Sequence, residues 1–215
     1  MTATSPATPV PRPRPRSVIV RSLLRGAWLG VLLGLLIESL VLLVQLLQGV
    51  LPGTVNLIAD TVQKISWSSL ICAILAAGQS AARGKIVSAG VAGLIGAPIA
   101  FLLARSLHKA MLELLGKESA TTAVAWLGAG IKGIEYALLG AMLLWLAERD
   151  AGWKWHAFFG ALTGLVTYLL VLWWLPAGGD AMQRAIIEIV HPVGCALAVH
   201  AATTFSKHLG SGKDA

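Results

Sequence analysis

The fold of this chain is decided by the stretch Gly26-Ala-Trp-Leu-Gly30-Val-Leu-Leu-Gly34-Leu-Leu-Ile-Glu38, which lies in a longer apolar run, Arg25–Gln48. Its three glycines and its glutamate recur at every fourth position, so on an α-helix they share one face. Glycine at this spacing lets a second membrane helix approach closely. A carboxylate about ten residues inside a membrane span is costly and is normally paired or functional. The stretch therefore predicts a closely packed membrane helix with a buried ionic site.

The composition is that of a membrane protein. Of 215 residues, 56% are hydrophobic and 13% are charged, and the mean hydropathy is +0.76. Soluble domains carry about 25% charged residues, so a lipid bilayer is the expected solvent. The sequence contains no Gly-x-Ser-x-Gly, P-loop or His-Glu-x-x-His motif, which disfavours the enzyme classes that these motifs mark. We expect no cofactor and no nucleic-acid partner.

Six apolar segments have the length of about 20 residues that is needed to cross the hydrocarbon core. The second and the sixth are short and rich in Ser, Ala, Gly and His, which suits the interior of a bundle. The fold class is therefore all-α, a polytopic membrane bundle of six helices in residues 21–208. A disordered Pro/Arg-rich tail over residues 1–20 precedes it and a flexible tail over residues 209–215 follows it. The predicted spans are Arg25–Gln48, Ile65–Ala82, Lys85–Ser106, Thr122–Ala147, Trp153–Leu175 and Ile189–Ser206.

Lysine and arginine are distributed unevenly between the two sides of these spans. With the N-terminus inside, the inner segments hold most of the Lys and Arg residues, as the positive-inside rule requires. All eight tryptophans lie near predicted span ends, in interfacial belts. These patterns predict an integral protein of the bacterial inner (plasma) membrane with both termini cytoplasmic. The arginines of the N-terminal tail then face anionic lipid or an acidic partner.

The spans can be grouped as three hairpins, which predicts an internal repeat. The segment Leu51–Ile65 matches Leu175–Ile189 without a gap. The odd spans align as well, in a register that makes Glu38, Ala97 and Gly164 equivalent positions. Repeats of this kind place polar sites near the midplane, where the units meet. The outer connections are expected to form short amphipathic helices, over Thr54–Lys64, Leu107–Leu115 and Asp180–Glu188.

Three ionisable residues converge in depth on the first and fourth spans. Glu38 and Glu135 each lie ten residues from a tryptophan at the inner interface, Trp28 and Trp145, and hence about 15 Å deep. Lys132 lies three residues from Glu135, on the same helix face. One interpretation is a structural ion pair, in which Lys132 binds Glu38 or Glu135 and fastens the two spans together. The other is a site that handles a proton or a cation.

Further residues add packing positions and weaker chemical candidates. Tyr168 continues a four-residue face of the fifth span and could line the same interior as the ionic site. His156 and His200, on two spans at comparable depth, form the candidate pair for haem ligation, although an ordinary hydrogen-bonded role is favoured for both. Cys72 and Cys195 are expected to be small buried residues without a disulfide. The helix-packing glycines are Gly26, Gly30, Gly34, Gly93, Gly133, Gly160 and Gly164.

These features favour a transport or channel-type membrane protein, which moves an ion or a small solute past a site formed by Glu38, Lys132, Glu135 and Tyr168. The alternative is a non-catalytic subunit or scaffold that binds other membrane subunits, or a second copy of itself, through its glycine faces. A haem-binding protein or another membrane enzyme is the third interpretation, and enzymatic activity is the less favoured class.

Overall fold

The computed structural model describes residues 15–82, 85–118, 125–174 and 181–211. Helices account for nearly all of these residues, and the described ranges contain no β-strand. In chain order the elements are α1 (Pro15–Leu47), α2 (Thr54–Ala82), α3 (Ile86–Leu114), α4 (Ala125–Glu148), α5 (Trp153–Trp174), α6 (Ala181–Ala185), the π-helix η1 (Ile186–Val190) and α7 (His191–Ser211).

Six helices are long and apolar enough to cross a bilayer. Five of them are α1 to α5, and the sixth runs without a break through α6, η1 and α7, over Ala181–Thr204. Large apolar side chains such as Leu47, Val87 and Trp173 are exposed on the outside of the bundle, where lipid would cover them. The prediction of an all-helical bundle with six membrane-spanning helices is therefore confirmed by length and composition.

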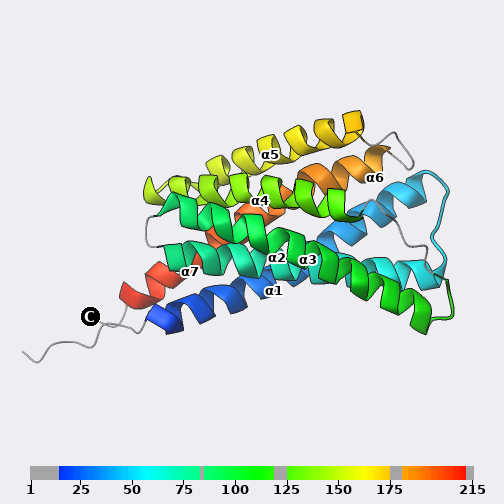
Figure 1. Cartoon of the computed structure of the whole chain (residues 1–215), viewed down its shortest axis with the longest axis horizontal. Helices are drawn as coiled ribbons and strands as arrows, with labels where there is room; N and C mark the ends of the chain where they lie inside the picture. The colour runs from blue at the N-terminus through cyan, green and yellow to red at the C-terminus, as the bar shows by residue number, and fades with distance from the viewer. Residues whose placement is uncertain (1–14, 83–84, 119–124, 175–180, 212–215) are drawn as a thin grey trace, which may run out of the picture.

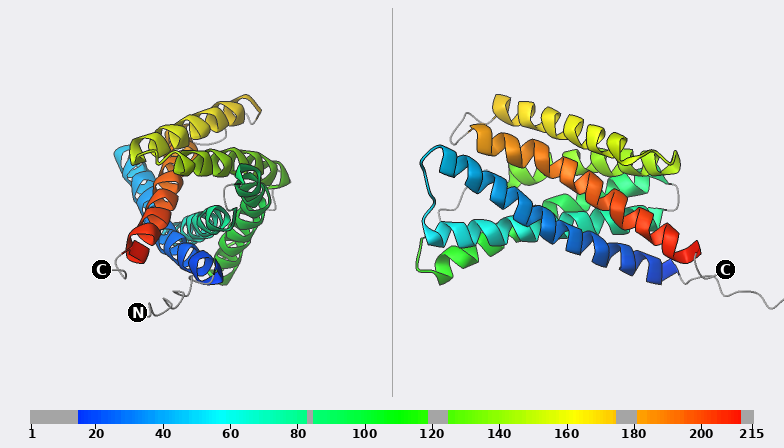
Figure 2. Two further views of the ribbon diagram at one scale, coloured as in Figure 1. Left: turned by 90° about the vertical axis from the view of Figure 1, so that its left-hand side faces the viewer. Right: turned by 180° about the vertical axis from the view of Figure 1, so that it is seen from behind.

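The helices lie side by side along the long axis of the molecule (Figure 1). α1 packs along α2, α3 along α4, and α5 along α7, while α2 also packs against α3 and α1 against α7. The start of α1 and the end of α7 lie at the same end of the bundle (Figure 2). We call this the terminal end and the opposite one the far end.

The first helix begins earlier than predicted. α1 starts at Pro15, so residues 15–20, which were expected in the disordered tail, are helical. Proline is tolerated in the first helical turn, and the next proline in the chain is Pro52, beyond the end of α1. Residues 209–211, which were expected in the flexible C-terminal tail, are also helical, because α7 continues to Ser211. Residues 1–14 and 212–215 of the two predicted tails lie outside the described residues.

The prediction of separate short helices at the far end is wrong. Thr54–Lys64 forms the first part of α2, and residues 107–114 form the last part of α3. In the third segment, the described residues from Ala181 onward continue through η1 into α7. Neither Pro nor Gly interrupts these segments, so nothing in the backbone breaks the helix at the predicted span ends. α3 ends just before Gly116, whose φ of 76° suits a glycine that terminates a helix.

The predicted packing glycines all lie against a neighbouring helix. A methyl group added at Gly26 would lie 2.6 Å from the carbonyl oxygen of Cys72, and one at Gly34 would lie 2.6 Å from Ile65 Cα, both on α2. Carbon atoms do not approach so closely, so these two positions require glycine. Gly30 also meets α2, Gly93 meets α4, Gly133 meets α3, Gly160 meets α7 and Gly164 meets η1.

One of these contacts compensates for a proline inside a span. Pro98 of α3 has no N–H, so the carbonyl oxygen of Leu94, four residues earlier, lacks its helical donor. Gly133 of α4 lies against both residues, because a methyl group there would be 2.9 Å from Pro98 Cγ and 3.1 Å from the Leu94 oxygen. A glycine Cα–H group at such a position can donate weakly to the freed carbonyl. A second proline and a second glycine, Pro192 and Gly164, lie beside a freed carbonyl in the same way.

Candidate functional site

The structure divides the predicted ionic residues between two places. Glu38 on α1 forms an ion pair with Lys64 on α2, and the two side chains are 7% and 16% exposed. Lys132 on α4 binds Glu135 and, in addition, Glu188 of η1. This corrects the predicted convergence of Glu38 with Lys132. Equal depth in a membrane does not place two side chains on facing sides of their helices.

The second of these places is a cluster of three charged residues, Lys132, Glu135 and Glu188, which we call the Lys132 cluster. The Lys132 ammonium nitrogen donates to Glu135 Oε2 at 2.7 Å and to Glu188 Oε2 at 2.6 Å. The three side chains are 10%, 0% and 13% exposed, respectively. One lysine therefore links two carboxylates that come from different spans.

A π-helix brings Glu188 to this cluster. Pro192, four residues further on, has no N–H to donate to the Glu188 carbonyl, and the helix widens into a π-turn over Ile186–Val190. Gly164 of α5 lies against that same carbonyl, and a side chain there would collide with it. π-turns inside α-helices occur frequently at functional sites. The pairing of Pro192 with Gly164 thus shapes the turn that carries one of the carboxylates.

The Lys132 cluster carries an unbalanced charge. With all three groups ionised, one lysine faces two carboxylates, and one negative charge has no counter-ion within the cluster. The second oxygen of Glu135, Oε1, is buried and has no hydrogen-bond partner among the described residues. An uncompensated charge in a low-dielectric interior is strongly unfavourable. The cluster is therefore suited to take up one proton or one cation.

Next to this cluster, His191 stands in a buried chain of hydrogen bonds. Its Nδ1 lies 2.5 Å from the Tyr136 hydroxyl, and its Nε2 lies 2.9 Å from Ser68 Oγ. The Trp67 ring stacks on the imidazole, with ring centroids 5.6 Å apart. A neutral imidazole donates from one nitrogen and accepts at the other, whereas a hydroxyl can do either. The chain can therefore adopt two orientations, which interconvert when a proton passes along it.

The hydrogen-bond chain and the Lys132 cluster are adjacent. Tyr136 directly follows Glu135 on α4, and the Lys132 ammonium nitrogen lies 6.0 Å from the centre of the Tyr136 ring. Four elements, α2, α4, η1 and α7, thus contribute to one contiguous buried polar region.

The two cysteines meet beside this polar region. Cys72 Sγ and Cys195 Sγ are 3.2 Å apart, and both residues are free thiols. Cys195 Sγ also lies 3.8 Å from His191 Nδ1. Both residues are fully buried, as the sequence indicates. The two cysteines are 123 positions apart in the chain, so their contact could not be predicted from the sequence.

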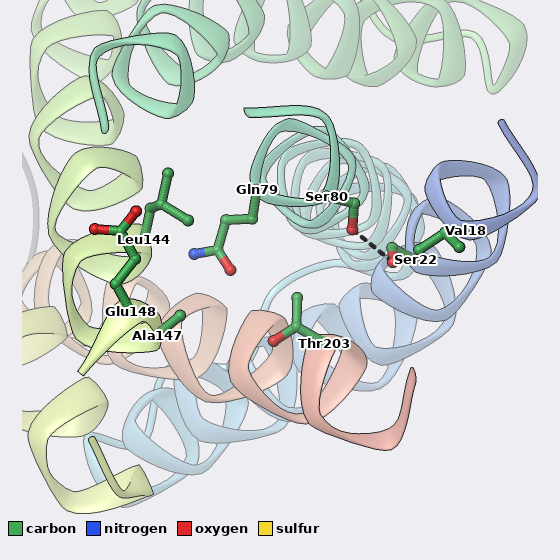
Figure 3. Close-up of a pocket in the computed structure, with 8 residues that line it drawn as sticks. All are labelled: Val18, Ser22, Gln79, Ser80, Leu144, Ala147, Glu148 and Thr203. Carbon is green, nitrogen blue, oxygen red and sulfur yellow. Dashed lines mark hydrogen bonds between the residues drawn. The ribbon is translucent and has the colours of Figure 1, made fainter. Parts of the chain in front are cut away.

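A pocket of ≈ 380 Å³ opens at the terminal end between α1, α2, α4 and α7. Figure 3 shows Gln79 of α2 reaching across it toward Leu144 and Glu148 of α4. On its other side Ser80 Oγ donates to Ser22 Oγ at 2.7 Å.

In α2 the buried Leu75 comes between Cys72 and Gln79, and in α7 the buried Val199 comes between Cys195 and Thr203. Buried apolar side chains therefore lie between the cysteines and the pocket, and we call them the apolar layer. Its residues are Leu75, Leu139, Leu143 and Val199.

The candidate haem ligands are arranged in a way that does not suit haem. The imidazole rings of His156 on α5 and His200 on α7 are in contact, with centroids 4.2 Å apart. Ligation by two imidazoles requires the porphyrin plane between the rings, and rings in contact leave no room for it. His156 Nδ1 donates to the Gly152 carbonyl at 3.1 Å, an ordinary structural hydrogen bond. Within the described ranges, no group of three or more His, Cys, Asp or Glu side chains could hold a metal ion.

Tyr168, which was also predicted for the ionic site, is half-buried on α5. No polar contact between described residues joins it to the Lys132 cluster. Four residues of the polar region and of the Glu38–Lys64 ion pair were not predicted. Lys64 and Glu188 fall in segments expected to lie outside the spans, whereas Ser68 and His191 lie inside predicted spans and meet only through the packing of α2 against α7. One signal was available, since Lys64 and Glu188 occupy the same position in the matched segments Leu51–Ile65 and Leu175–Ile189. The four residues are Lys64, Ser68, Glu188 and His191.

Comparison of the chain with protein-family models, with curated proteins and with solved structures gives no match.

Proposed function

We propose that this protein is a membrane transporter that moves a proton or a small cation through its six-helix bundle, and that the Lys132 cluster is the site at which the charge binds. The observation that carries the proposal is the excess of one carboxylate over lysine in this cluster, inside a bundle of membrane-spanning helices. Ionisable groups are retained in such surroundings mainly where they serve ion or proton movement.

A polar face of α2 supports a path through the bundle. Lys64, Ser68 and Cys72 follow one another at four-residue spacing, and Gln79 lies two turns further toward the terminal end. Ser68 belongs to the His191 chain, and Gln79 lines the terminal pocket. The apolar layer interrupts this face, so the conformation described is closed between the pocket and the Lys132 cluster. In a transport cycle this layer would move and open the cluster toward the pocket.

The terminal end is proposed to be cytoplasmic, in a bacterial plasma membrane. Arg16, Arg21 and Arg25 lie in the first turns of α1, and Arg149 and Lys154 lie at the connection between α4 and α5, all at this end. Such an excess of basic residues marks the cytoplasmic side. Anionic lipid on that side is the proposed partner of the arginines that precede α1.

Close contacts between helices support the correspondence of the first and third hairpins of the proposed repeat, in a changed register. Gly34 lies against Ile65 of α2, and Gly164 lies against Ile189 of η1. These two isoleucines are the matched ends of the repeated segments. Gly34 therefore corresponds to Gly164, one helical turn away from the register expected from the odd spans.

In this register the proposed repeat is asymmetric in its charged groups. Glu38 corresponds to Tyr168, and Lys64 corresponds to Glu188. The first hairpin contains the ion pair of Glu38 with Lys64. At the corresponding positions the third hairpin has only the carboxylate of Glu188, which binds Lys132 of the second hairpin. A site at the junction of repeat units is a common arrangement in transporters.

The alternative of a scaffold protein was based on two features, the glycine faces and the far-end amphipathic segments. The seven packing glycines are occupied by helices of the same chain, and the far-end segments continue into the spans. Neither feature then favours the scaffold over the transporter.

Flux through reconstituted liposomes tests the proposal. Wild-type protein should carry protons or an alkali cation down an imposed gradient, measured with a pH-sensitive or a cation-sensitive dye. Glu135→Gln and Glu188→Gln should reduce the flux to that of protein-free liposomes, because each removes the excess negative charge. Glu113→Gln is the matched control, since Glu113 is a carboxylate of α3 with a 57% exposed side chain.

Tryptophan fluorescence of each variant would show that it remains folded. Undiminished flux in both cluster variants would contradict the proposal, and so would a wild-type protein that carries neither protons nor alkali cations.

A further inference from the structure

A groove of ≈ 280 Å³ lies between α4 and α5, and Glu135 is one of its lining residues. Its walls include Ile134, Leu138 and Val166, which are exposed on the outside of the bundle. In a membrane these side chains face lipid. A molecule dissolved in the bilayer could therefore enter the groove sideways, without passing through either end of the bundle.

The polar atoms in this groove can only accept hydrogen bonds. Glu135 lines the groove, and its oxygen Oε1 is buried and has no hydrogen-bond partner among the described residues. Thr163 and Thr167 also line the groove, but their hydroxyl protons are committed to the carbonyl oxygens of Phe159 and Thr163, at 2.8 and 3.1 Å. What remains at each threonine is an oxygen lone pair. The groove is thus an apolar slot with acceptors on its inner side.

We propose that this groove binds a lipophilic ammonium ion, an alkylated amine that reaches Glu135 from the bilayer. Its N–H groups donate to Glu135 Oε1 and the threonine oxygens, and its positive charge balances the excess carboxylate of the Lys132 cluster. This inference rests on the proposed function and names the substrate class of the same site.

The chemistry of the groove selects against related molecules. An anion is repelled by the excess carboxylate, and a neutral alcohol leaves that charge uncompensated. A quaternary ammonium ion has no N–H to donate, and proteins hold such ions with aromatic rings. None of the groove's described lining residues is aromatic. A protonated primary or secondary amine with an alkyl chain meets all the requirements, and the groove is close to the lower size limit of about 300 Å³ for small-molecule sites.

Equilibrium binding to the full-length protein in lipid nanodiscs tests this inference, with empty nanodiscs as background. The probes are octylammonium, octyltrimethylammonium and octanol, which share one chain and differ in charge and donor groups. Octylammonium should bind saturably and at least about tenfold more tightly than the other two, because it alone makes a charge-assisted hydrogen bond. Glu135→Gln should abolish this preference.

A second variant tests whether octylammonium binds in the groove. Leu138→Trp fills the groove from its exposed wall, so octylammonium binding should be lost. Ile99→Trp is the matched control and should bind octylammonium as the wild type does, because Ile99 is an exposed apolar residue of α3 that does not line the groove. Equal binding of the three probes, or no saturable binding above empty nanodiscs, would overturn the inference. If such binding is absent and flux depends on Glu135, only the substrate class is wrong. If binding follows the prediction and no flux occurs, the groove is a binding site and the proposed transport is wrong.

Discussion

The bundle contains two buried ionic sites that differ in their charge balance. Glu38 and Lys64 form a one-to-one pair between α1 and α2, so their charges cancel. In the Lys132 cluster a single lysine binds two carboxylates, so the cluster has one carboxylate in excess. A balanced pair requires no further counter-ion and can serve as a structural link between two helices. An unbalanced cluster gains free energy when a proton or a cation arrives, which is what a binding site requires.

The backbone is regular at the Glu38–Lys64 pair and irregular at the Lys132 cluster. The Glu38–Lys64 pair joins two regular α-helices, held close by Gly30 and Gly34. Glu188, by contrast, projects from a π-turn. An irregular turn costs stability in a membrane unless the surroundings compensate for it, so its presence at the unbalanced cluster indicates a functional constraint.

The largest effect is expected when the cation of the unbalanced cluster is removed. Lys132→Met leaves the fully buried Glu135 carboxylate and the partly buried Glu188 carboxylate without their shared cation, which should lower the free energy of unfolding by about 3–5 kcal/mol. Equilibrium unfolding in mixed micelles, followed by tryptophan fluorescence, measures this loss. The double variant Lys132→Met/Glu188→Gln should recover part of it. A single variant as stable as the wild type would show that the carboxylates do not depend on Lys132.

A smaller effect is expected when the backbone contacts of the two sites are obstructed. Gly164→Ala pushes the Glu188 carbonyl away from α5, and Gly34→Ala pushes α1 from α2. Each should cost about 2–3 kcal/mol of unfolding free energy through overpacking, but only Gly164→Ala should reduce cation flux. Gly130→Ala is the control, because no other helix lies within 4 Å of a methyl group there. Equal losses of flux in the Gly34 and Gly164 variants would mean that the two sites are not functionally distinct.

Breaking the balanced pair should cost less than breaking the cluster. Glu38→Gln leaves Lys64 without its counter-ion, but the Lys64 side chain is 16% exposed and can extend toward the far-end surface. We expect a loss of about 1–2 kcal/mol in unfolding free energy, between the values typical of exposed and fully buried pairs. Restoration of stability in Glu38→Gln/Lys64→Met would identify the pair as structural. A loss as large as that of Lys132→Met would remove the proposed distinction.

The smallest effect on stability is expected in the hydrogen-bond chain. Tyr136→Phe removes the hydroxyl that lies 2.5 Å from His191 Nδ1, at a cost of about 1 kcal/mol. Proton flux should fall more than alkali-cation flux, because only a proton can pass along the chain. Measuring the two fluxes in parallel separates these effects. An equal fall in both would exclude a relay through His191.

The sequence predicts the features that depend on one helix at a time. The four-residue spacing of Gly26, Gly30 and Gly34 and the three-residue spacing of Lys132 and Glu135 act within a single helix, whose periodicity is known beforehand. The six spans follow from apolar length in the same way. Their far-end limits do not, because polar segments such as Thr54–Lys64 continue a helix whenever no proline or glycine stops it.

Contacts between helices could not be predicted in this way. Depth is a single coordinate, and it placed Glu38 level with Lys132 without fixing the direction in which either side chain points. The rotation of each helix depends on the packing of the whole bundle. Glu188 was missed for a further reason, since its position depends on a π-turn that arises only when Pro192 lies inside a continuous helix. The contact of Cys72 with Cys195 is likewise a product of the packing of α2 against α7.

The most direct test of the distinction between the two sites is a side-by-side flux measurement on Glu38→Gln and Glu135→Gln in liposomes with equal amounts of folded protein. Both substitutions neutralise one buried carboxylate and preserve its shape. We expect Glu38→Gln to retain the wild-type flux of protons or cations, whereas the flux of Glu135→Gln should fall to the level of protein-free liposomes. Equal loss in both variants, or retained flux in Glu135→Gln, would contradict this distinction.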